Sequence, residues 1–290
     1  MPTSTQAETA LPAGLPRRTL MAAVAGLAGL AAGPLRAQDH TPSPIPHRMP
    51  PEPDSGPRPR VAMLVYPRMI LLDLVGPQTV LNIAGCDIDL VWKSRDAVST
   101  DVGIPLVPTA TFEDYDARPD VLFVPGGLMG SLDCMGDPAV LAFLRAKAAT
   151  ATWVTSVCTG SLVLGAAGLL QGYRATSHWG VRDLLPMLGA TLVTDRVVED
   201  RNRITGGGAT AGLDFGLVLA ERLKDRATAE RVQLILEYAP QPPFDLGTPE
   251  LAGPERLSAA RARRVGMDEE ALKATQAAAS RLRRPGQAED

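Results

Sequence analysis

Short apolar runs alternate with segments rich in alanine and leucine from about residue 60 to residue 238, separated by polar, glycine or proline residues. Several runs are apolar at consecutive positions, which is typical of strands buried on both faces, whereas alanine and leucine favour helix. The expected strands are 60–66, 88–93, 121–124, 154–157, 174–177 and a hairpin-like pair at 191–198 and 203–205; the expected helices are 78–84, 137–149, 161–170, 180–188, 209–223 and 229–238. This alternation predicts an α/β fold, a three-layer sandwich built on a mostly parallel sheet.

Cys158 stands where the β-branched and aromatic run 152–157, the composition of a buried strand, gives way to an expected helix, with Thr159 and Gly160 in the turn between them. A sharp strand-to-helix turn of this kind is the geometry of a nucleophile elbow, here with cysteine in place of serine. The positive end of the helix would lower the pKa of the thiol. The alternative is an inert cysteine, since free cysteine is among the most buried residue types. The small residues around Cys158 favour the nucleophile, because they would admit a substrate.

Asp73 is the strongest candidate for an acid beside this thiol. It follows the first expected strand within the apolar stretch LLDLVGP, where burial would raise the pKa of the carboxyl and let it pass a proton near neutral pH. The alternative is that Asp73 caps the following helix. Gly126 and Gly127 follow the strand 121–124, and in parallel sheets the site lies beyond the carboxyl ends of the strands. We therefore expect this glycine turn and the Cys158 elbow to border one site.

Thr159 offers a hydroxyl and a backbone N–H, and with the N–H of Gly127 or its neighbour Gly126 it would stabilise developing negative charge. Threonine is also common at helix starts for capping alone, which is the alternative. His178 is the one imidazole inside the expected fold, and the residue directly after Cys158 is Thr159 rather than a histidine. We therefore expect His178 in the wall of the pocket rather than as a base. The glycine run 206–208 lacks the spacing of a phosphate loop and is expected to be a turn beside the pocket.

The composition narrows the function classes. A net charge of −3, with 21% charged and 45% hydrophobic residues, describes a globular chain without the basic excess of a nucleic-acid-binding protein. The residues after position 239 are also too few for a paired helix-turn-helix module. With 3 cysteines, 3 histidines and no C-x-x-C pair, a structural zinc site is not expected. At least one of the cysteines must stay free.

The first residues have the pattern of an export signal rather than of a folded domain. Arg17 and Arg18 precede an apolar run rich in alanine, glycine and leucine, and this order favours the twin-arginine route with cleavage near Ala37. The run is too short for a membrane span. The expected organisation is an export signal at 1–37, a proline-rich linker at 38–59, the α/β domain at 60–245 and a helical extension at 246–290. The expected location is periplasmic, or cytoplasmic if the N-terminus is not processed.

With these residues in place, the sequence resembles the DJ-1/PfpI family, within the class I glutamine-amidotransferase-like fold. The resemblance is carried by PGG at 125–127, SVCTGSLVLGAAGLL at 156–170, RATSHW at 174–179 and TGGGATAGLDF at 205–215. Within the family the chain is most similar to the branch that hydrates isonitriles, through DLVGP at 73–77, LVWK at 90–93 and RVQLILEYAPQPPF at 231–244. These long matches cover about 60–244, most of the expected domain.

The resemblance implies a flavodoxin-like fold and the hydration of an isonitrile to an N-substituted formamide through a thioimidate on cysteine. The catalytic trio of that branch is an aspartate, the elbow cysteine and the threonine after it, which correspond here to Asp73, Cys158 and Thr159. It also implies a homodimer, and no metal or organic cofactor. Two alternatives stay open: a ligand-sensing protein, and a redox sensor whose Cys158 is oxidised, both without turnover.

Overall fold

The computed structural model describes residues 58–283. The expected export signal at 1–37 and nearly all of the expected linker at 38–59 lie outside these residues. Within them, no helix is long and apolar enough to cross a membrane.

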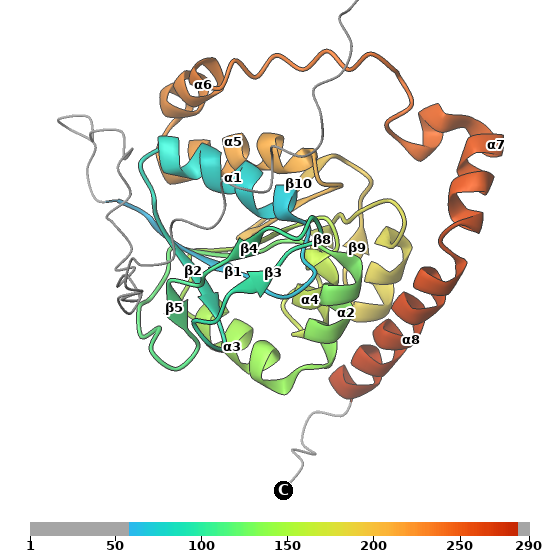
Figure 1. Ribbon diagram of the computed structural model, residues 1–290, viewed down its shortest axis with the longest axis horizontal. Helices are drawn as coiled ribbons and strands as arrows, with labels where there is room; N and C mark the ends of the chain where they lie inside the picture. Colours follow the sequence, from blue (N-terminus) through green and yellow to red (C-terminus); the bar gives the residue numbers. More distant parts are fainter. Residues whose placement is uncertain (1–57, 284–290) are drawn as a thin grey trace, which may run out of the picture. The chain divides into compact units, whose positions relative to one another are not determined.

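A seven-stranded sheet forms the centre of the domain (Figure 1), with the strand order β10-β11-β7-β6-β1-β2-β5. Every neighbouring pair is parallel except β10 with β11, as the alternating pattern predicted. β6 and β7 are buried along almost their whole length, which explains their continuous apolar sequences. The strands are β1 (Arg60–Leu64), β2 (Asp87–Trp92), β5 (Ala110–Thr111), β6 (Val121–Val124), β7 (Trp153–Val157), β10 (Val197–Asp200) and β11 (Arg203–Gly206).

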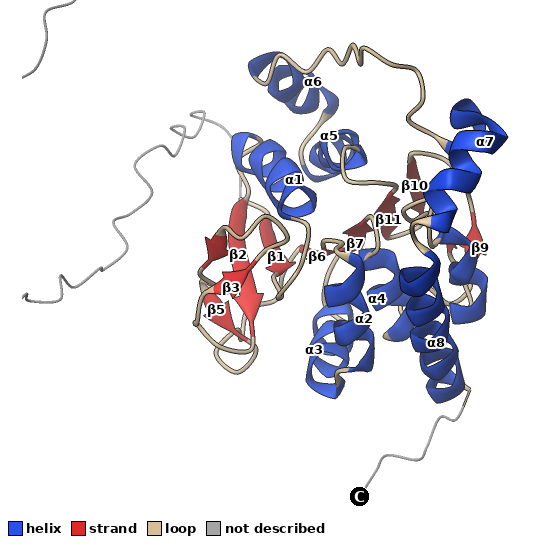
Figure 2. Cartoon of the chain, turned by 45° about the vertical axis from the view of Figure 1, so that its right-hand side comes forward, coloured by secondary structure: helices blue, strands red, loops and turns tan. Residues whose placement is uncertain are grey.

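Helices cover both faces of this sheet, which confirms the three-layer sandwich (Figure 2). One layer holds α1 (Leu71–Ile83), α5 (Ala211–Leu223) and α6 (Arg226–Ile235). The other holds α2 (Leu128–Gly136), α3 (Pro138–Ala148), α4 (Gly160–Ala166) and the 3-10 helix η1 (Arg182–Leu188). Phe123 of β6 and Phe215 of α5 are fully buried and pack together, with 5.5 Å between their ring centroids.

Several elements differ from the prediction. α1 begins at Leu71 and runs through Pro77, so Asp73 lies in its first turn instead of in a preceding loop. α2 was not predicted, because two glycines in LMGSLDCMG lower its helix propensity. The segment expected as a hairpin at 191–198 is split: β9 (Thr191–Leu192) pairs with β8 (Arg174–Ala175), and only β10 pairs with β11. A second small sheet joins β3 (Val98–Ser99) to β4 (Pro105–Leu106).

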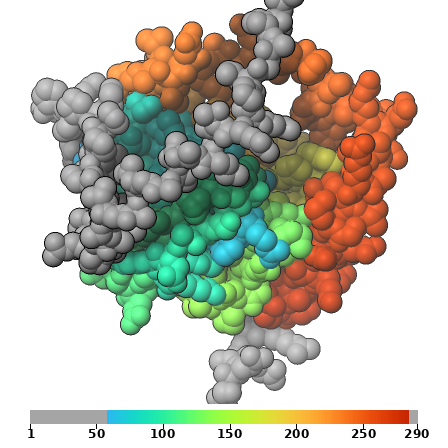
Figure 3. All heavy atoms as spheres, viewed as in Figure 1, coloured from blue at the N-terminus to red at the C-terminus, as the bar shows by residue number. Residues whose placement is uncertain are grey.

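The extension after residue 245 forms two helices, α7 (Pro249–Ala262) and α8 (Val265–Leu282). α8 packs against α2 and η1 through a stripe of small residues that includes Ala271 and Ala278, both fully buried. Arg281 donates to the carbonyl of Met135 at 2.6 Å. Figure 3 shows the red atoms of the extension lying against segments that precede it in the sequence. The extension is therefore part of the packed domain.

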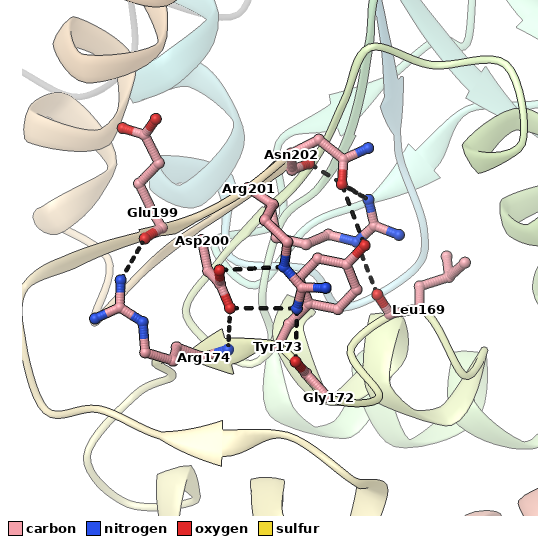
Figure 4. A network of polar contacts seen from close by, with 9 residues as sticks. Leu169, Gly172, Tyr173, Arg174, Glu199, Asp200, Arg201 and Asn202 are labelled. Carbon is pink, nitrogen blue, oxygen red and sulfur yellow. Dashed lines mark hydrogen bonds and ion pairs between the residues drawn. The ribbon is translucent and has the colours of Figure 1, made fainter.

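A polar network joins the β10–β11 turn to the loop before β8 (Figure 4). The ring of Tyr173 lies 3.6 Å from the guanidinium of Arg201 and 4.5 Å from that of Arg203. The Asp200 carboxylate accepts the backbone N–H of Arg174 at 2.7 Å. Because β11 begins here, this network stabilises the sheet edge opposite the carboxyl ends of the parallel strands.

Candidate active site

Cys158 occupies a strained turn between β7 and α4. Its φ of 54° is a left-handed conformation that is uncommon for non-glycine residues. The neighbouring backbone holds it there: its N–H donates to the carbonyl of Gly207 at 2.7 Å. Its carbonyl accepts the hydroxyls of Ser177 at 2.8 Å and Ser161 at 3.1 Å. The predicted nucleophile elbow is present.

Asp73 reaches this elbow from the first turn of α1. Its side chain is fully buried, and its Oδ2 accepts the N–H of Gly126 at 2.9 Å. It lies beside the elbow, because a Cβ placed on Gly126 would be 2.5 Å from Asp73 Oδ2 and 2.6 Å from Cys158 Cβ. In the described part of the chain no hydrogen-bond partner reaches Oδ1. The residue at the N-cap position is Ile70, so Asp73 is not a helix cap. One carboxyl oxygen is thus held by the protein while the other stays available for proton exchange.

Burial sets the protonation of this pair. It raises the pKa of Asp73 to about 7, although the bonds from Cys158 and Gly126 act in the opposite direction. Burial, together with the charge of Asp73, also raises the pKa of the Cys158 thiol well above its ordinary value, although the Thr159 N–H lowers it. The expectation of a low thiol pKa at the helix N-terminus was therefore wrong, because desolvation outweighs the backbone N–H. Near neutral pH the resting pair is a thiol beside a carboxyl that is losing its proton.

Gly126 and Gly127 lie against the elbow, as the carboxyl-end rule predicted, but their amides are already used. The Gly126 N–H donates to Asp73, and the Gly127 N–H donates to Thr159 Oγ1 at 2.9 Å. Neither is free to stabilise an oxyanion in this structure, so that expected role is not supported. Gly127 has a φ of 134°, and a Cβ there would lie 2.5 Å from the Cα of Met69. The turn thus requires glycine and serves to position the acid.

Thr159 follows the elbow, and its hydroxyl faces away from the sulfur. Besides the Gly127 amide it contacts Ser131 Oγ at 2.8 Å, and it makes no side-chain cap bond to α4. The capping alternative is therefore not what the structure shows. The backbone N–H of Thr159, and not its hydroxyl, lowers the pKa of the Cys158 thiol.

A cavity of about 420 Å³ opens beside the sulfur. Cys158 is only 2% exposed, yet it lines this cavity. Ile70 and Trp179 supply apolar wall, and the remaining lining is mostly hydroxyl, glycine and charged groups. Gly207 and Gly208 border it, as expected for the glycine run. A volume of this size is typical of small-molecule sites.

His178 also lines the cavity, in agreement with its expected place in the wall. Burial and the nearby Arg264 lower the pKa of its imidazole to about 4, so the ring is neutral at physiological pH. Its Nδ1 accepts the N–H of Gly180 at 3.1 Å, which puts the ring proton on Nε2. His178 is thus a hydrogen-bond donor to a ligand and a poor base.

The sequence patterns missed two parts of the site. Ser131 and Tyr66, on α2 and after β1, hydrogen-bond next to Thr159, and nothing in their local sequence marks them. Residues 247–250 line the cavity although they belong to the extension that was set outside the domain. Glu250 there pairs with Arg182 of η1 at 2.9 Å. The one available signal was Thr248-Pro249-Glu250, a helix-start pattern that shows a helix but not where it packs.

The other cysteines are structural. Cys86 and Cys134 are buried and unpaired, and burial raises the pKa of Cys86 to about 12 and that of Cys134 further. No group of three or more His, Cys, Asp or Glu side chains among residues 58–283 is arranged to hold a metal ion.

Comparisons with known proteins agree with this geometry. The model of the DJ-1/PfpI family matches residues 59–222. Isonitrile hydratase from Pseudomonas putida is 50% identical over 224 residues, which cover 77% of this chain and 97% of that protein. A crystal structure of a ThiJ/PfpI family protein from Pseudomonas syringae is 45% identical, with a TM-score of 0.74 over 80% of this chain and 98% of that one. DJ-1beta from Drosophila melanogaster, at 24% identity and a TM-score of 0.59 over 63% of this chain and 100% of its own, shows the same fold. The chain therefore belongs to the DJ-1/PfpI family.

Proposed function

We propose that this protein is an isonitrile hydratase, which adds water to R–N≡C and releases the N-substituted formamide R–NH–CHO. One observation carries the proposal: the buried Asp73 carboxyl lies beside Cys158, both against Gly126, and Cys158 stands in the wall of a small-molecule cavity. The relative in Pseudomonas putida that bears this name supports it, since it is 50% identical over 77% of this chain and 97% of its own length.

The first step adds the thiol to the terminal carbon of the isonitrile. As the Cys158 sulfur forms its bond to that carbon, the Asp73 carboxylate accepts the thiol proton and delivers it to the same carbon. The product is the thioimidate R–N=CH–S–Cys158, with no proton gained or lost overall. A carboxyl with a pKa of about 7 suits this role because it can both accept and donate a proton near neutral pH.

The second step resolves the thioimidate with water. The water oxygen bonds to the thioimidate carbon while Asp73 accepts a proton from that water. Asp73 then donates a proton to the nitrogen, which gives R–NH–CH(OH)–S–Cys158. The hydroxyl proton then moves to sulfur as the C–S bond breaks, releasing R–NH–CHO and restoring the thiol. The neutral His178, which lines the cavity, provides an N–H donor suited to the oxygen or nitrogen of this intermediate.

Turnover of cyclohexyl isocyanide to the formamide tests the proposal. The wild type is expected to release N-cyclohexylformamide, and Cys158→Ala is expected to release none. Cys86→Ala, a second buried cysteine away from the cavity, is the matched control and should retain turnover. Binding without turnover in the wild type would favour the sensing alternative. Selective oxidation of Cys158 by peroxide without turnover would favour the redox sensor, which the raised pKa of this thiol disfavours.

The pH dependence follows from the same pair. Below about pH 7 both Asp73 and Cys158 are protonated, so no group can accept the thiol proton. The active state forms when Asp73 and Cys158 together lose one of their two protons, whether the remaining proton lies on the carboxyl or on the sulfur. We expect kcat/KM to rise about tenfold per pH unit up to about pH 7 and to level off above it. A rate that falls as pH rises through 7 would contradict this assignment.

We further propose that the chain is exported and works as a homodimer. The pattern at 1–37 supports export, and fractionation of cells that produce the full chain would show the location. The family resemblance supports the dimer. So does exposed apolar surface at Leu72, Val102 and Ile104, on segments joined by the bond from the Leu71 N–H to the Asp101 carboxylate. Light scattering after gel filtration would show whether the mass is twice that of one chain.

A further inference from the structure

Three buried hydroxyls form a continuous chain behind the elbow. Tyr66 Oη lies 3.0 Å from Ser131 Oγ, which lies 2.8 Å from Thr159 Oγ1. All three side chains are at most 3% exposed. Gly130 makes the approach possible, because a Cβ at that position would lie 2.8 Å from the Tyr66 ring.

The available donors and acceptors determine in which direction the three hydroxyls of this hydrogen-bonded chain donate. Tyr66 stays protonated, since burial raises its pKa well above the ordinary value, and its O–H donates to the carbonyl of Pro125 at 2.7 Å. Ser131 must then donate to Tyr66, and Thr159 to Ser131. The reverse order would leave the Thr159 proton without an acceptor in a buried place, which is costly. Thr159 Oγ1 accepts the Gly127 N–H at the end of the chain.

The three hydroxyls therefore bind both ends of the Pro125–Gly127 turn: Tyr66 donates to the Pro125 carbonyl, and Thr159 accepts the Gly127 N–H. Gly126, the residue between them, holds Asp73 through its N–H and lies against Cys158. A shift of this turn moves the hydrogen bond that orients the carboxyl beside the sulfur. None of the three residues lines the cavity, and their hydrogen bonds reach Asp73 by way of the turn at Gly126, so the influence of the three hydroxyls on catalysis passes through Gly126.

We propose that Ser131 and Tyr66 are positioning residues for the reaction at Cys158, which hold the Gly126 amide on Asp73 by way of Thr159. This rests on the proposed function for its effect on rate, but the geometry at Cys158 is testable without any isonitrile. The charged groups that act on the pair besides each other are Asp101 on Asp73 and Arg264 on Cys158, and neither belongs to the chain.

Ser131→Ala tests this proposal. We expect kcat for cyclohexyl isocyanide to fall about 10- to 100-fold with KM changed less than twofold, since the loss concerns orientation and not binding. We also expect the acidic limb of the rate to move upward by about half to one pH unit, because a loosened Gly126 N–H stabilises the Asp73 carboxylate less. Ser156→Ala is the matched control: Ser156 Oγ is buried on β7 without a hydrogen-bond partner among residues 58–283, so its removal should change neither quantity.

Tyr66→Phe provides a second, independent variant that keeps the ring. If Tyr66 and Ser131 act through the same hydrogen-bonded chain, kcat of the Tyr66→Phe/Ser131→Ala double variant should be no lower than kcat of the slower single variant. Circular dichroism and thermal unfolding show whether each variant folds, and Tyr66→Phe carries the test if Ser131→Ala does not fold.

The readout that needs no substrate is the rate of Cys158 alkylation by iodoacetamide against pH, followed on the Cys158 peptide by mass spectrometry. The pH at which alkylation reaches half its maximal rate should be higher in Ser131→Ala or Tyr66→Phe than in Ser156→Ala, by the same half to one pH unit. If the wild type turns over no isonitrile but the profile moves, the positioning inference holds and the proposed function fails. If isonitrile is hydrated and neither kcat nor either profile differs from the control, the positioning inference is overturned.

Discussion

Gly126→Ala is expected to lower kcat for isonitrile hydration at least about 1000-fold, the largest effect of any substitution outside Cys158 and Asp73. A Cβ on Gly126 would lie 2.5 Å from Asp73 Oδ2, 2.6 Å from Cys158 Cβ and 2.7 Å from the Thr159 nitrogen. Real Cβ atoms do not approach so closely, and two of these neighbours are backbone or next to it. The added methyl must therefore displace the acid or the elbow.

The reason for so large an effect is that both reacting groups share this one contact. A displacement of about 1 Å in a catalytic group can cost about 100-fold, and here the carboxyl and the thiol move apart from each other. Gly136→Ala is the matched control, because nothing lies within 4 Å of a Cβ at that position on α2 and alanine suits a helix. Single-turnover measurement of thioimidate formation and product release would show the loss in the first step. A Gly126→Ala enzyme within tenfold of the wild type would show that the tight packing around this glycine does not govern the chemistry.

Asp73→Asn is expected to lower kcat/KM by about 1000-fold while it stabilises the folded protein at neutral pH. The asparagine has a similar shape but cannot accept the thiol proton. The stability effect follows from linkage. Because burial raises the pKa of Asp73 from its ordinary 3.8 to about 7, the wild type is most stable, relative to the variant, below pH 3.8. That advantage is lost as pH rises towards 7, and above pH 7 the difference levels off.

The size of this change is about 4 kcal/mol between pH 4 and pH 7, from about three pKa units at 1.36 kcal/mol each. Urea unfolding of both proteins at several pH values between 4 and 8 measures it as a difference of two curves. Asp96→Asn, at an exposed carboxylate, is the control and should show no comparable trend. A difference that does not change with pH would mean that Asp73 does not titrate near 7. The functional carboxyl therefore lowers stability at the pH at which it works, as is common for active sites.

Much of the arrangement follows from local patterns. The β-branched and aromatic run before Cys158 and the apolar run before Gly126 predicted two strands, β7 and β6, and the structure pairs them with each other. Since parallel strands end at the same edge, the glycine turn and the elbow had to meet there, and they do. Asp73 was found from its isolation among apolar residues, which burial in the structure explains.

Other features depend on atoms far apart in the sequence. The helix N-terminus beside Cys158 predicted a low thiol pKa, but desolvation, which no local pattern reports, raises it. The same holds for the direction of the Thr159 hydroxyl, set by Ser131 on a helix that the glycines concealed. Residues 247–250 line the cavity because the chain returns to η1 there, where Glu250 pairs with Arg182.

Periodicity and turn chemistry were thus sufficient for the mostly parallel sheet and for the elbow at Cys158, because these depend on neighbours along the chain. The choice of Asp73 as the acid also needed the family resemblance. The protonation of the pair, the free and occupied amides, and the outer wall of the cavity were decided by packing. Solvent exclusion and hydrogen-bond partnership are properties of groups that meet only after the chain has folded.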